Sequence, residues 1–149
     1  MSFLKKISSN VNKLNDLNKL YEWIPNENTI RPFNDDLKNE YVNNLIANYG
    51  DLKKGTLIDI FGISNFDNIQ PLKLFKENKF RYNTNGNHYV MWYLGYDENL
   101  LSDDIISMDI YVNLLKLVGN NNFNFAWYKN PKMTIPDIFH VQVFWINQN

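Results

Sequence analysis

The stretch FHVQVFWI, residues 139–146, carries the strongest indication of the fold. Its odd-numbered residues are all apolar, and they alternate with His140, Gln142, Phe144 and Ile146. Alternation of this kind is the spacing of a β-strand, whose successive side chains point to opposite faces. Because both faces carry apolar residues, we expect this strand to be buried on both sides and to lie inside a sheet, not at its edge.

Other segments predict strands that would join this one. In residues 122–127, Phe123, Phe125 and Trp127 alternate with smaller or polar residues, as in a half-buried strand. Earlier in the chain, residues 79–83 and 88–95 flank the sequence TNGN, and Asn-Gly at such a position is a strong hairpin signal. We therefore expect a mainly antiparallel sheet in the C-terminal part of the chain.

The segment from residue 102 to residue 118 supports two interpretations. Ser102 followed by two aspartates is a good helix start, and Gly119 is a good helix stop. However, apolar residues alternate strictly at five positions from Ile106 to Leu114, and the Ile and Val content favours a strand. The sequence predicts a strand here by a small margin, with residues 119–122 as a hairpin turn.

Helices are predicted before the sheet. Apolar residues recur at steps of three and four between residues 4 and 24, and again between Leu37 and Ile46, with Asn34 as a cap and Gly50 as the end of the second helix. Residues 57–63 are too short a run to assign to helix or strand. The predicted fold class is α+β, with N-terminal helices packed on a mainly antiparallel C-terminal sheet, in one globular domain spanning residues 1–149.

Composition limits the source and the class of the protein. Asparagine supplies 26 of the 149 residues, and 13 Lys stand against two Arg, which is typical of an AT-rich coding genome, bacterial or viral. There is no cysteine, so disulfides, thiolate metal sites and thiol nucleophiles are excluded. A net charge of −1 does not favour nucleic acid, and no run of apolar residues is long enough to span a membrane. We expect a cytoplasmic protein with no cofactor and no membrane contact.

Catalytic motifs are weak. His88 and His140 are far apart in the sequence, which argues against a zinc site. One alternative is a magnesium-dependent nuclease or other hydrolase, in which Asp59 and Glu77 hold the ion and Lys79 stabilises the attacking hydroxide. This alternative requires the three side chains to meet at one site.

The main functional prediction rests on an acidic stretch that contains no Lys or Arg between residues 97 and 115. Acidic patches attract cationic surfaces, and Tyr and Trp anchor protein interfaces. The sequence predicts a non-catalytic inhibitor or immunity-type protein that neutralises a partner, a cationic toxin or host enzyme. The partner-binding residues would be Trp92, Tyr93, Tyr96, Asp97, Glu98, Asp103 and Asp104. A further alternative is a carbohydrate-binding, peptide-binding or viral structural module that uses an open aromatic face of the sheet.

Overall fold

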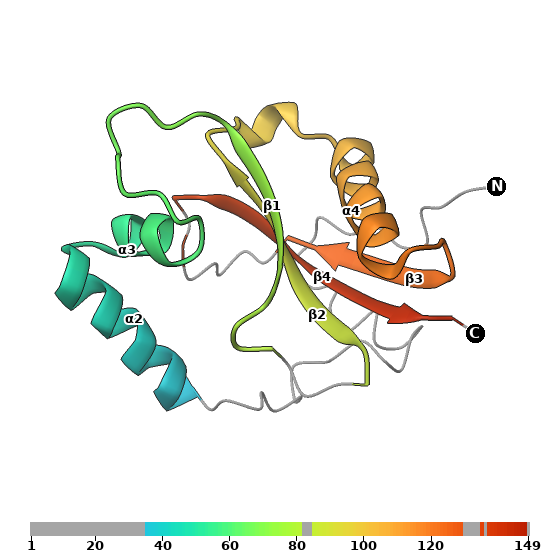
Figure 1. Ribbon diagram of the computed structural model, residues 1–149, viewed down its shortest axis with the longest axis horizontal. Coiled ribbons are helices and arrows are strands. Elements are labelled where there is room, and N and C mark those ends of the chain that lie inside the picture. The colour runs from blue at the N-terminus through green and yellow to red at the C-terminus, as the bar shows by residue number, and fades with distance from the viewer. Residues whose placement is uncertain (1–34, 82–84, 130–134, 136, 149) are drawn as a thin grey trace.

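A computed structural model describes residues 35–81, 85–129, 135 and 137–148 (Figure 1). The helices and strands of this part of the chain follow one another in the order α2 (Asp35–Tyr49), α3 (Leu52–Asp59), β1 (Leu72–Glu77), β2 (Asn87–Leu94), the 3-10 helix η1 (Glu98–Leu100), α4 (Asp103–Val118), β3 (Phe123–Tyr128) and β4 (Phe139–Asn147). The predicted α+β class is confirmed. The helix predicted over residues 4–24 lies outside the described residues. No helix within the described ranges has the length and apolar character that crossing a membrane requires.

The described strands form one antiparallel sheet in the order β1-β2-β4-β3. Strand β4 is paired on both sides, with Trp92 of β2 opposite His140 and Phe125 of β3 opposite Trp145. The central position predicted for residues 139–146 is therefore confirmed. The strand predicted at residues 123–127 is also present, as β3 at the edge of the sheet.

Helix α4 covers one face of the sheet, and α2 and α3 lie on the other side (Figure 1). The alternating residues of β2 divide between the two layers, because Met91 and Tyr93 pack on the α4 side whereas Val90 and Trp92 pack on the α3 side with Leu57. Strand β4 divides in the same way. Its Val141 and Val143 belong to the α4-side core, whereas Phe144 is buried on the opposite face, so apolar residues occur on both faces of the strand.

Residues 102–118 form a helix, so the predicted strand is wrong. The Ser102 side chain accepts a hydrogen bond from the Ile105 N–H at the start of α4, and Gly119 ends the helix with a left-handed φ of 89°. Of the alternating apolar residues, Ile106, Ile110 and Leu114 are buried, whereas Met108 and Val112 are exposed. That division follows a helical repeat, because residues four apart share one face of a helix. The predicted turn at residues 119–122 follows the helix end and does not join two strands.

The predicted hairpin has the right second strand but the wrong first strand. Strand β2 pairs with residues 72–77, and the first strand does not extend into residues 79–81. The side chain of Asn78 accepts a hydrogen bond from the Phe80 N–H at 2.8 Å, which turns the backbone out of the extended conformation. The segment 57–63, left open by the sequence, begins inside helix α3, whose N-cap is Asp51.

The helical assignment of residues 103–118 predicts a specific stability effect. Replacement of Ser102 by Ala removes the N-cap hydrogen bond and should lower the free energy of unfolding by about 1 kcal/mol. The matched control is Ser64→Ala in the exposed loop after α3, where we expect a change within about 0.5 kcal/mol. Urea unfolding of both variants, followed by circular dichroism, measures the difference. Equal effects at the two serines would contradict a capping role for Ser102.

Candidate functional site

The predicted partner-binding residues do not share one surface. Trp92 and Tyr93 are 7% and 1% exposed, and as neighbours on β2 they point to opposite faces of the sheet. Both belong to the cores, so neither is available to anchor a partner protein in this conformation. Tyr96, Asp97, Glu98, Asp103 and Asp104 are exposed, and they follow β2 through η1 into the first turn of α4.

The buried side chain of Tyr93 is connected to this surface through Asp109 and Lys73. Its hydroxyl donates a hydrogen bond to Asp109 Oδ2 at 2.9 Å, and Lys73 Nζ lies 3.0 Å from the same carboxylate oxygen. Burial, reinforced by the charge of Asp109, raises the pKa of Tyr93, so its hydroxyl stays a hydrogen-bond donor at neutral pH. Lys73 Nζ also lies 5.4 Å from the centre of the Tyr96 ring. These contacts connect Tyr96 to the sheet and to α4.

The acidic residues have different local roles. Asp97 accepts a hydrogen bond from the Asn99 N–H and begins η1, and Glu98 forms an ion pair of 2.6 Å with Lys129. Asp103 and Asp104 occupy the first turn of α4, where negative charge favours the helix dipole. Among the described residues, Lys129 is the only cation in an ion pair with any of these four carboxylates. The surface is therefore negative.

Apolar side chains that the sequence analysis did not select lie among these acids. Leu100 is 75% exposed, and Ile105, Met108 and Val112 are between 39% and 43% exposed. The last three are spaced by three and four residues, so they share the outer side of α4. Their spacing was visible in the sequence, but it has this meaning only if the segment is a helix. We call Tyr96, these four apolar residues and the four acids the η1–α4 surface.

The residues of the predicted hydrolase site are only partly brought together. Lys79 Nζ lies 2.8 Å from Asp59 Oδ2, and the Tyr41 hydroxyl also donates to that oxygen. Glu77 borders the same region, but Phe75, two residues earlier in β1, stacks on Tyr89 in the α4-side layer. Burial is the main cause of the raised pKa of Tyr89, and the charge of the nearby Glu77 raises this pKa further. Because side chains alternate along a strand, the Glu77 carboxylate and Asp59 lie on opposite sides of the sheet.

The described residues contain no cluster of three or more acidic or histidine side chains that could hold a metal ion. The two histidines sit on adjacent strands and are buried. His88 Nε2 donates to Gln142 Oε1 at 2.6 Å, and His140 Nδ1 donates to the Ile138 carbonyl oxygen at 2.7 Å. Each ring therefore has a hydrogen-bonded partner, as expected for a histidine within a sheet.

Comparison of the chain with protein-family models, curated proteins and solved structures found no match.

The Asp59–Lys79 pair predicts a pH-dependent contribution to stability. Burial alone would raise the pKa of Asp59, but the hydrogen bonds from Lys79 and Tyr41 outweigh it and lower the pKa below the ordinary value of 3.8. A lowered pKa in the folded state means that the stabilisation is present above 3.8 and is lost as the pH falls through the folded-state value.

Replacement of Lys79 by Gln should therefore lower the free energy of unfolding at pH 7 by up to about 1 kcal/mol, because the pair is partly exposed to solvent. The difference from the wild type should shrink as the pH falls below about 4. Urea unfolding over a pH series measures it, with the exposed Lys53→Gln as the matched control. A difference that persists unchanged at low pH would contradict the assignment.

Proposed function

We propose that the chain binds a partner protein through the η1–α4 surface. The observation that supports this proposal is the arrangement of exposed apolar side chains on the outer side of α4, bordered by Asp97, Glu98, Asp103 and Asp104. Single exposed apolar residues are ordinary, but a group of them with an acidic rim at one end, here at the start of α4, is typical of an interaction site. The partner would present Lys or Arg side chains around an apolar centre.

Charge and apolar contact would contribute at different stages of binding. The carboxylates accelerate the encounter with a basic surface, and their effect weakens with ionic strength. Leu100 and Met108, which are the most exposed apolar residues of the surface, would then be buried in the complex and slow its dissociation. In its concrete form, the proposal is an inhibitor or immunity-type protein that neutralises a toxin or host enzyme by covering the partner's active site.

The other functions considered from the sequence have less geometric support. The hydrolase alternative requires Glu77 beside Asp59, whereas the strand places their side chains on opposite sides of the sheet. Exposure of Trp127 or Trp145 would favour the module with an open aromatic face, but these residues are 1% and 6% exposed.

Neutralisation of the acidic rim tests the proposal. A variant with Asp97→Asn, Glu98→Gln, Asp103→Asn and Asp104→Asn should bind the partner at least tenfold more slowly at low salt, because the attraction of opposite charges is removed. The Asn at position 97 can still cap η1, so the fold is preserved. The partner is first isolated from the source organism with the wild-type chain as bait, and association rates are then measured with purified proteins.

The matched control neutralises exposed acids of another surface, with Asp36→Asn, Glu40→Gln and Asp67→Asn, and it should bind as the wild type does. A second variant, Met108→Gln with Leu100→Gln, keeps the charge and should mainly increase the dissociation rate. Equal binding by the wild type, the acidic-rim variant and the apolar variant would overturn the proposal.

A further inference from the structure

A cleft lies on the other side of the sheet from α4, between the sheet and helix α2. Its floor is the middle of the sheet, with Val90 and Trp92 of β2 beside His140 and Gln142 of β4. Its opposite wall includes Tyr41 of α2. The cavity volume is about 130 Å³. An engineered apolar cavity of about 150 Å³ holds one benzene molecule, so this space fits a single aromatic ring.

His140 places an unused acceptor at the floor of the cleft. Its side chain is 6% exposed, and its Nδ1 donates to the Ile138 carbonyl oxygen. The proton is thereby fixed on Nδ1, and Nε2 of the neutral ring is left as an acceptor. Burial lowers the pKa of His140, which favours this neutral form. Within the described ranges, no group hydrogen-bonds to Nε2, although the ring packs against Trp92 in a tilted arrangement with centroids 4.4 Å apart.

Gln142 places a donor beside this acceptor. Its Oε1 accepts hydrogen bonds from His88 Nε2 at 2.6 Å and from Asn78 Nδ2 at 3.0 Å. Because both neighbours donate, the amide oxygen is turned toward them and the Gln142 amide nitrogen is directed away. Gln142 and His140 are two residues apart on β4, so both point to the same face of the sheet. The floor thus offers an acceptor and a donor to one bound molecule.

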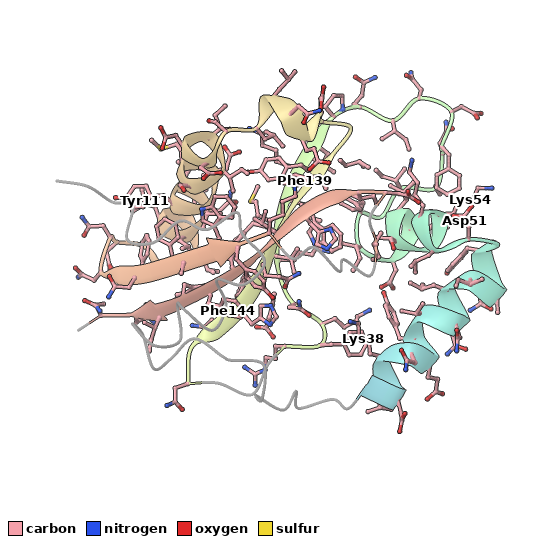
Figure 2. All side chains as sticks on the ribbon, turned by 180° about the vertical axis from the view of Figure 1, so that it is seen from behind. Lys38, Asp51, Lys54, Tyr111, Phe139 and Phe144 are labelled. Atoms are coloured by element: carbon pink, nitrogen blue, oxygen red, sulfur yellow. The ribbon has the colours of Figure 1, made fainter. Side chains whose placement is uncertain are left out.

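The rim of the cleft is positively charged. Lys38, Lys76 and Lys79 border it, and Lys38 extends from α2 on the side that faces the sheet (Figure 2). Lys76 Nζ donates to the Ile60 carbonyl oxygen at 2.9 Å, which keeps its charge at the rim while leaving two of its three protons for other acceptors. The carboxylate of Asp59 offsets Lys79, and no comparable acid pairs with Lys76 among the described residues.

We propose that this cleft binds a small planar aromatic anion. The ring lies against Val90 and Trp92, a ring O–H or N–H donates to His140 Nε2, and a carboxylate or phosphate is held by the lysines of the rim. An apolar cavity with a few convergent polar groups is the usual form of a small-molecule site. The site is independent of the η1–α4 surface, because the two lie on opposite sides of the sheet.

Titration with two defined probes tests the proposal. 4-Hydroxybenzoate supplies a ring, a donor and a carboxylate, and uridine 5′-monophosphate supplies a ring N–H and a phosphate. At least one of them should bind and shift the amide NMR signals of Trp92, His140 and Gln142. Phenol, which lacks the anion, and benzoate, which lacks the donor, should each bind at least tenfold more weakly than 4-hydroxybenzoate. Binding of only the nucleotide, or of only the aromatic acid, identifies the source of the anion.

Variants locate the bound molecule. His140→Phe keeps a ring on Trp92 but removes the acceptor, and it should weaken binding about tenfold, which corresponds to about 1.4 kcal/mol. Lys38→Gln with Lys76→Gln leaves the Asp59–Lys79 pair intact and should also weaken binding at least fivefold. The matched control is Lys53→Gln with Lys54→Gln on α3, where Lys54 lies apart from the cleft (Figure 2), and it should bind within twofold of the wild type.

Two results would overturn the proposal. The first is the absence of binding by both probes at about 10 mM, the weak end of specific recognition. The second is binding that is unchanged in the His140 variant and in the Lys38 and Lys76 variant, both shown to be folded by circular dichroism. The lysine variant alters exposed or half-buried side chains only, so it keeps the test valid if the buried His140 variant unfolds.

Discussion

The burial of β4 on both faces is the constraint on which the rest of the structure depends. The strand is paired on both sides and has no free edge, and it carries apolar side chains on both faces, which need to be covered above and below the sheet. Val141 and Val143 are covered by α4, whereas His140 and Gln142 face the cleft that α2 closes. The two helical layers therefore perform different tasks. The α4 layer completes one apolar core, whereas the α2–α3 layer combines a second apolar cluster with a space that has polar groups at its floor.

Helix α4 is positioned by contacts that only a helix could make. Ile106, Ile110 and Leu114 are spaced to pack on the sheet, and the Trp127 indole N–H donates to Ser107 Oγ at 2.8 Å inside the core. The same geometry directs Ile105, Met108 and Val112 to the outer side. The η1–α4 surface is thus a consequence of how the helix satisfies the core, and not an independent addition to the fold.

Much of the fold was accessible from the sequence, whereas the candidate sites were accessible only in part. The acids of the η1–α4 surface were found because charge is visible in the residues themselves. Trp92 and Tyr93 were chosen for their chemistry, but their burial depends on which helices cover β2. No local sequence pattern indicates which helices these are. The cleft was missed for the same reason, since its residues come from two helices, all four strands and the loops between them, and are separated by up to 104 positions, from Lys38 to Gln142.

The sequence by itself determined the α+β class and the central place of β4, because alternation depends on near neighbours along the chain. It also offered Ser102 and Gly119 as helix caps, but it favoured a strand between them. Only the tertiary structure decided that residues 103–118 form a helix. An alternating apolar run is compatible with either a strand or a helix, and the choice depends on how the segment packs against the sheet. The tertiary structure also decided which faces of β2 and β4 became core and which became cleft. Burial depends on how the layers pack together, and it cannot be predicted from the sequence of a single segment.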